Sequence, residues 1–163
     1  MTSSEMEQLL DVLAQKMIGK GLRLVTAESC TGGMLAQWMT AFAGSSRWFE
    51  CGFVTYSNES KIRILGVQPE ALDRHGAVSM QVAEQMALGA LRNSNADIAV
   101  SITGIAGPTG GSSVKPIGTV YISTVKQDQP PCTIHHAFGG DRAAIREWSA
   151  ISAVTHLISQ YGE

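Results

Sequence analysis

The sequence predicts an α/β protein, a three-layer α/β/α sandwich whose sheet is mostly parallel with one antiparallel strand. Short apolar runs typical of buried strands alternate with amphipathic helical segments for most of the chain. Two late strands, separated by a short polar stretch, interrupt this alternation and predict a hairpin. The chain has 163 residues, of which 44% are hydrophobic, so we expect a single domain over residues 1–163 with a sizeable core.

In the first half of the chain, apolar residues at three- and four-residue spacings over residues 4–19 predict an amphipathic helix. Leu22–Ala27 is short and apolar, as expected of a central strand. The elements predicted next are a helix over Met34–Phe42, a strand over Cys51–Tyr56, a helix over Asn58–Leu65, a further short helix between Gly66 and Gly76, and a helix that Ser79 caps and that continues through Leu91.

The second half begins with a predicted strand over Ile98–Thr103. Residues 104–118 contain five glycines and two prolines without apolar periodicity. They predict a loop beyond the usual ~12–15 residues, which favours a functional role. Gly118–Val125 and Cys132–Phe138 are the predicted strands of the hairpin, and Asp141 starts the last helix. We interpret the tryptophans as core residues: Trp38, Trp48 and Trp148.

Composition argues against several classes of protein. The 12 basic and 14 acidic residues give a net charge of −2, which offers no reason to expect nucleic-acid binding. The cysteines, Cys30, Cys51 and Cys132, lie far apart, which argues against a disulfide framework or a zinc knuckle and favours a reducing compartment. The N-terminal segment lacks the unbroken apolar stretch of a signal peptide, and no segment approaches the ~20 apolar residues that cross a bilayer. We therefore expect a cytoplasmic protein without nucleic-acid or membrane partners.

Residues 26–33, Thr-Ala-Glu-Ser-Cys-Thr-Gly-Gly, join the first predicted strand to the helix that follows. Enzymes often place a nucleophile at such a junction, and Ser29 would lie beside backbone N–H groups that can receive negative charge. Gly32 and Gly33 would let a substrate approach the backbone closely. The alternative interpretation is a helix N-cap followed by glycines that ease packing.

A second segment places a tyrosine and a lysine after the second predicted strand. Tyr56 ends that strand, and Lys61 lies about one and a half helical turns later. Both side chains could lie at the same edge of the sheet as Ser29, because consecutive strands are usually neighbours in the sheet. A desolvated lysine can be neutral enough to act as a base, whereas a lone lysine on a helix is more often solvated.

A third segment, Ser101–Gly111, leaves the third predicted strand at the same edge, where ligands of open α/β sheets bind. Its free N–H groups suit a phosphate or an oxyanion, although its spacing matches neither a Walker A loop nor a dinucleotide fingerprint. Arg142 stands in the first turn of the last helix, where it opposes the macrodipole unless it binds an anion. A surface arginine is the alternative.

Together these segments resemble the CinA C-terminal domain family, the nicotinamide-nucleotide amidohydrolases. The blocks that carry the resemblance are Thr26–Gly33, Ala43–Glu50, Gly52–Lys61, Gly76–Ser79, Ser101–Gly111 and Lys115–Val120. The resemblance implies a three-layer α/β/α domain with a five-stranded mixed sheet, in agreement with the predicted strands. Larger members carry an additional N-terminal domain, so this chain looks like the stand-alone form.

The resemblance also implies an activity: hydrolysis of nicotinamide mononucleotide to nicotinate mononucleotide and ammonia, a step of pyridine-nucleotide salvage, without a cofactor or a metal. By position, Ser29 would be the nucleophile, Lys61 its base and Tyr56 an assisting group. Backbone N–H groups would hold the oxyanion, and Arg142 with the loop would hold the 5′-phosphate. The residues expected to bind the substrate are Thr31, Gly32, Gly33, Thr103, Gly104, Gly107 and Arg142.

The chain departs from the family pattern at Thr109, where the loop commonly carries an aspartate. The alternative function is a catalytically weak or inactive paralogue that binds a nucleotide without hydrolysing it. An apolar face on the first helix, or the edge of the hairpin, could bury in a homodimer.

Overall fold

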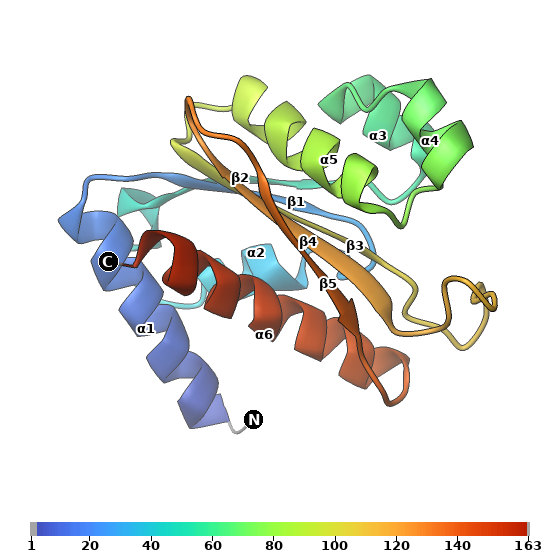
Figure 1. The fold of residues 1–163 in the computed structure, drawn as a ribbon. Coiled ribbons are helices and arrows are strands. Elements are labelled where there is room, and N and C mark those ends of the chain that lie inside the picture. The colour runs from blue at the N-terminus through green and yellow to red at the C-terminus, as the bar shows by residue number, and fades with distance from the viewer. Residues whose placement is uncertain (1–2, 163) are drawn as a thin grey trace.

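Five strands form one mixed sheet that helices cover on both faces (Figure 1). The computed structural model describes residues 3–162. Helices α3, α4 and α5 lie on one face of the sheet, and α1, α2 and α6 lie on the other. The predicted three-layer α/β/α sandwich is therefore confirmed.

The strands are β1 (Leu24–Glu28), β2 (Phe49–Val54), β3 (Ile98–Gly104), β4 (Thr119–Lys126) and β5 (Cys132–Ala137). The helices are α1 (Ser3–Gly19), α2 (Met34–Met39), α3 (Asn58–Leu65), α4 (Pro69–His75), α5 (Met80–Arg92) and α6 (Arg142–Tyr161), with a 3-10 turn, η1 (Ser45–Arg47), before β2.

The strand order is β2-β1-β3-β4-β5, and only β4 runs against the others. The first three strands are parallel neighbours, and the hairpin adds β4 and β5 at one side. As a result, β1, β2, β3 and β5 all end at one edge of the sheet, which is where polar groups that follow these strands can meet.

Two cores fill the space between the layers. Along the central strands, successive side chains enter opposite cores: Leu24 packs toward α1 and α6, whereas Val25 packs toward α3, α4 and α5. In β3, Ile98 and Ala99 divide in the same way. Burial on both faces explains why these strands are apolar at nearly every position.

Some predicted boundaries are wrong by a few residues. β1 starts two residues later than predicted, because the Leu22 N–H donates to the Met17 carbonyl (2.9 Å) and still closes the end of α1. β2 starts and ends two residues earlier than predicted, with Phe49 opposite Leu24. α2 ends at Met39 instead of continuing to residue 42.

The interpretation of Trp148 as a core residue is also wrong, since this side chain is 43% exposed. Ile145 and Ser149, its neighbours on α6, are the residues that turn inward. Trp48 is buried and Trp38 is half-buried, as expected of side chains in or beside the core.

Candidate active site

Ser29 lies on a tight turn between the end of β1 and the start of α2. Its N–H donates to the Ile102 carbonyl (3.0 Å), so the first residue of the turn is still tied to β3. Gly32 and Gly33 then take φ angles of 61° and 99°, a left-handed conformation that other residues adopt only with strain. The turn lifts the hydroxyl to the carboxyl edge of the sheet, where it is 8% exposed.

Lys61 reaches Ser29 from α3. Ser57 caps this helix by accepting the Ser60 N–H (3.1 Å), which starts the helix close to the end of β2. The Lys61 side chain is 1% exposed. Its Nζ lies 2.9 Å from Ser29 Oγ, and it donates to the carbonyls of Thr55 (2.7 Å) and Tyr56 (3.2 Å).

Burial lowers the pKa of Lys61 to about 8. A neutral amine has two N–H donors and one lone pair. The two carbonyls of residues 55 and 56 can take both donors, which leaves the lone pair for the Ser29 hydroxyl proton. The arrangement can therefore accept a proton from Ser29 near neutral pH.

These groups line a cavity of about 210 Å³ at the carboxyl edge. The residues that line it are Ser29, Cys30, Tyr56, Lys61, Ala77, Val78, Thr103, Gly104, Ala106 and Arg142. Among the residues predicted to form the site, Thr31, Gly32, Gly33 and Gly107 do not line this cavity.

Tyr56 and Arg142 meet at the cavity. The Tyr56 hydroxyl accepts a hydrogen bond from Arg142 Nη2 (3.0 Å), while Arg142 Nη1 donates to the Gly107 carbonyl (2.7 Å). The Tyr56 side chain is 61% exposed, and its backbone carbonyl, not its phenol, contacts Lys61. Gly107 thus takes part through a carbonyl that orients Arg142.

Thr103 and Gly104 form the wall contributed by β3. Thr103 Oγ1 donates to the Ala77 carbonyl (2.9 Å), which joins this strand to the segment before α5. A Cβ on Gly104 would lie 2.7 Å from Val120 Cγ2 and 3.2 Å from Cys30 Sγ, so only glycine fits there. Four other residues that line the cavity were not predicted individually: Cys30, Ala77, Val78 and Ala106. Cys30 directly follows Ser29, and the other three fall in blocks that resemble the family.

Cys30 is a second potential nucleophile that lines the cavity. Burial raises the pKa of its thiol to about 11, and the nearby Glu28 carboxylate adds to this effect. A thiol with this pKa stays protonated near neutral pH and is a poor nucleophile. Ser29 is therefore the better candidate.

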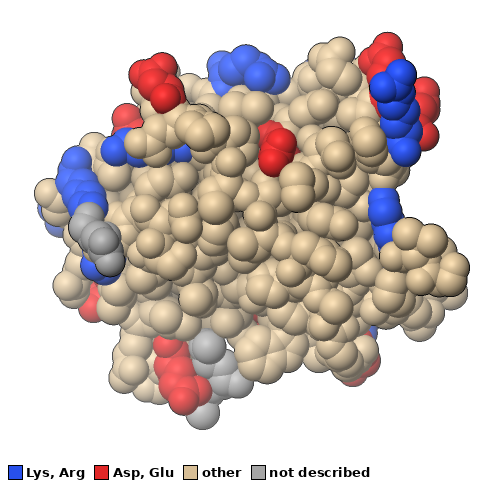
Figure 2. Space-filling model, in the orientation of Figure 1, with Lys and Arg blue, Asp and Glu red and all other residues tan. Residues whose placement is uncertain are grey.

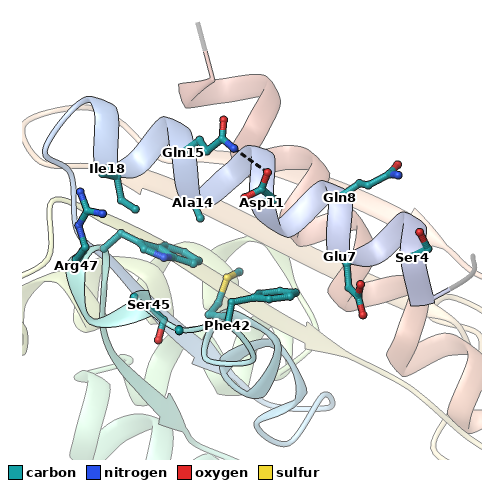
Figure 3. A pocket seen from close by; sticks show the side chains of 14 residues that line it. Ser4, Glu7, Gln8, Asp11, Ala14, Gln15, Ile18, Phe42, Ser45 and Arg47 are labelled. Carbon is teal, nitrogen blue, oxygen red and sulfur yellow. Dashed lines mark hydrogen bonds between the residues drawn. The ribbon is translucent and has the colours of Figure 1, made fainter.

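A larger cavity, of about 420 Å³, lies between α1 and residues 39–48 (Figure 3). Phe42 and Trp48 are among its apolar lining residues, and Gln8 and Asp11 of α1 are among its polar ones. Its lining contains no serine–lysine pair, so the smaller cavity is the candidate active site. Across residues 3–162, no three His, Cys, Asp or Glu side chains are placed to hold a metal ion.

An α/β domain with a serine hydroxyl against a buried amine has the components of a serine–lysine hydrolase. The sequence matches the CinA C-terminal domain over residues 6–161, and the chain belongs to this family. The resemblance inferred from the sequence is thereby confirmed.

Several relatives match nearly the whole chain. The nicotinamide-nucleotide amidohydrolase PncC of Escherichia coli K12 is 48% identical over 161 residues, which cover 99% of this chain and 98% of PncC. A putative competence-damage inducible protein of Caldicellulosiruptor saccharolyticus is 46% identical over 151 residues, which cover 93% of this chain but only 36% of that longer protein. The crystal structure of the competence/damage inducible protein CihA from Agrobacterium tumefaciens has a TM-score of 0.94 and 42% identity, with 98% of this chain and 97% of that chain covered.

Proposed function

We propose that this chain, acting as a single domain, hydrolyses nicotinamide mononucleotide to nicotinate mononucleotide and ammonia, with Ser29 as the nucleophile. The observation that carries the proposal is the 2.9 Å contact between Lys61 Nζ and Ser29 Oγ at the cavity. The name of the relatives that match along their whole length, nicotinamide-nucleotide amidohydrolase, supports the choice of substrate.

The reaction begins when neutral Lys61 takes the Ser29 proton and Ser29 Oγ forms a bond to the carboxamide carbon. Two backbone carbonyls orient Nζ, so the amine is held in place for this transfer. Negative charge develops on the carboxamide oxygen. The N–H of Cys30, which directly follows the nucleophile and lines the cavity, is our candidate donor; such a contact contributes ~3–4 kcal/mol.

In the next step, the Lys61 ammonium returns a proton to the departing nitrogen as the C–N bond breaks, and ammonia leaves. Water then attacks the acyl carbon, gives its proton to Lys61, and releases the acid as Ser29 recovers its hydrogen. No oxidant or reductant is consumed.

Arg142 and the loop over residues 104–111 are proposed to bind the 5′-phosphate. Arg142 lines the cavity, and the contacts to Tyr56 and Gly107 fix its guanidinium. Thr109, where the chain departs from the family pattern, is exposed and does not line the cavity around Ser29. Because this departure leaves Ser29 and Lys61 in contact (2.9 Å), we favour an active enzyme over a paralogue that only binds a nucleotide.

The test is ammonia release from nicotinamide mononucleotide by the purified protein and by Ser29→Ala. The proposal expects release by the wild type, none above background in Ser29→Ala, and unchanged release in Ser94→Ala, a serine that follows α5 and donates to the Ala90 carbonyl of that helix (2.8 Å). Tight nucleotide binding without release in the wild type would instead support the non-catalytic paralogue.

We also propose that the protein is a homodimer that packs through the side of the molecule formed by β5 and α6. β5 is an edge strand of the sheet, and Trp148 is exposed on α6. In Figure 2, charged side chains lie mostly around the margin of this face. Sedimentation should show a dimer that Trp148→Arg weakens; a monomeric wild type would contradict it.

A cytoplasmic location is likewise a proposal, supported by the free thiols of Cys30, Cys51 and Cys132. No helix within residues 3–162 is long and apolar enough to cross a membrane. Cell fractionation would test the location.

A further inference from the structure

The turn that carries Ser29 has little structure of its own to hold it. Within residues 29–34, its backbone hydrogen bonds are Gly32 N–H to the Ser29 carbonyl (3.0 Å) and Met34 N–H to the Thr31 carbonyl (3.1 Å). The helix that follows is only six residues long, and Gly33 at its N-cap offers no side-chain cap. Such a turn needs contacts from elsewhere to fix its shape.

Glu28, the last residue of β1, supplies one set of contacts to the turn. Its side chain is fully buried, and its two carboxylate oxygens accept the N–H groups of Leu35 (2.9 Å) and Ala36 (3.0 Å). A negative group at these N–H groups replaces the missing cap and interacts favourably with the helix dipole. The far end of the turn is thus anchored to the last residue of β1.

Arg146 supplies the other set from α6. Its Nε donates to the Cys30 carbonyl (3.1 Å), and its Nη2 donates to the Thr31 carbonyl (3.0 Å). The planar guanidinium therefore fixes two successive peptide groups with one rigid side chain. The Thr31 carbonyl and the Gly32 N–H belong to the same peptide group. The Gly32 N–H donates to the Ser29 carbonyl, so the hydrogen bonds run from Arg146 to the backbone of the nucleophile itself.

We propose that Arg146 is a positioning residue for Ser29: together with Glu28, it holds the 29–33 turn in the shape that keeps the hydroxyl against Lys61. Arg146 does not line the cavity, so it acts through the turn and not on the substrate. Arg142, one helical turn earlier, lines the cavity, so α6 serves the substrate and the nucleophile with different arginines. This role rests on the proposed hydrolase function.

The experiment measures kcat and KM with nicotinamide mononucleotide for the wild type and for Arg146→Ala. We expect kcat to fall about 10²-fold, because a small misplacement of the reacting groups has an effect of this size, while KM changes less than about threefold. Millimolar guanidinium chloride, far below denaturing concentrations, should restore part of the lost kcat by occupying the vacated position. A purely structural role would not produce this rescue.

Arg23→Ala is the control, because Arg23 directly precedes β1, at the end of the strand opposite Ser29, and its Nη2 pairs with Glu50 Oε2 (2.5 Å). It should keep the wild-type kcat and show no response to guanidinium. If Arg146→Ala does not fold, Arg146→Lys takes its place; it keeps the charge without the planar fork, and its kcat should still fall.

Two results would overturn the inference: a folded Arg146 variant with the wild-type kcat, or a loss in Arg146→Ala that guanidinium leaves unchanged. Either result is distinguishable from failure of the proposed function, in which the wild type itself releases no ammonia.

Discussion

Lys61 is a side chain that the fold keeps almost entirely out of water. It faces two carbonyls and one hydroxyl, and none of its hydrogen-bond partners is a carboxylate that would stabilise its charge. Burial therefore dominates, and it moves the pKa of the amine to about 8. This pKa suits Lys61 to the proposed role of a base that works close to neutral pH.

The dependence of rate on pH follows directly. In the proposed mechanism only neutral Lys61 accepts the Ser29 proton, so kcat should rise about tenfold per pH unit below pH ~8 and level off above it. Ammonia release at saturating nicotinamide mononucleotide, followed from pH ~6 to ~9, measures the profile. A flat profile across that range would remove Lys61 as the base.

Cys30 gives a second prediction for a single residue. Because burial raises its pKa to about 11, the thiol is protonated near neutral pH and takes no part in the chemistry. Cys30→Ala should keep kcat within about threefold, since it leaves Ser29, Lys61 and the backbone N–H of residue 30 in place. Loss of activity comparable to that in Ser29→Ala would instead make the thiol the nucleophile.

At the scale of the element, α3 determines where the base lies. Ser57 caps this helix at a point directly after β2 and the Thr55–Tyr56 carbonyls, four residues before Lys61. The helix has only eight residues, so its first turn is a large part of its stability.

Ser57→Ala should lower the free energy of unfolding by about 1 kcal/mol through loss of the cap, and it should lower kcat because Lys61 is held less firmly. Ser57→Thr, which keeps a capping hydroxyl, is the control and should retain most of both. Denaturant unfolding and ammonia release measure the two effects. An unchanged unfolding midpoint in Ser57→Ala would contradict the role of the cap.

The elements themselves could be predicted because local patterns determine them. The bounds of α3 are those predicted from the sequence, and Ser79 and Asp141 cap α5 and α6 as expected. The ends of β1 and α2 differ from the prediction because hydrogen bonds at helix ends, such as that from the Leu22 N–H to the Met17 carbonyl, decide them and leave no clear mark in the sequence pattern.

Contacts across the whole molecule determine the rest of the site. The approach of Lys61 to Ser29 could be anticipated because both follow neighbouring strands. The hydrogen bonds from Arg146 to the turn span more than a hundred positions of sequence: 116 to Cys30 and 115 to Thr31. No local pattern indicates them. The orientation of the Tyr56 hydroxyl toward Arg142 likewise depends on how α6 lies against the sheet.

The buried amine also affects the stability of the whole fold. Its pKa is about 8 in the folded protein and 10.5 in the unfolded chain, so the unfolded chain binds more protons between these values. The contribution of Lys61 to stability therefore increases as pH rises from ~8 to ~10.5, and it levels off below pH ~8, where both states bind the proton.

The contribution of this group between pH ~7 and ~9 is about 1.4 kcal/mol in the free energy of unfolding. Lys61→Met, which cannot titrate, should lack this increase, so the difference between the wild type and the variant should change by that amount. Urea unfolding at both pH values measures it. Parallel curves for the two proteins would mean that burial does not shift the pKa of Lys61.

The central claim, that Ser29 attacks the carboxamide, is tested most directly by trapping the covalent intermediate. Hydroxylamine added during turnover of nicotinamide mononucleotide should intercept the acyl-enzyme and yield the hydroxamate of nicotinate mononucleotide, and rapid acid quenching should leave the acyl mass on the peptide that contains Ser29. Both products should be absent in Ser29→Ala. Hydrolysis that proceeds without either product, or an acyl group found on Cys30, would contradict the account.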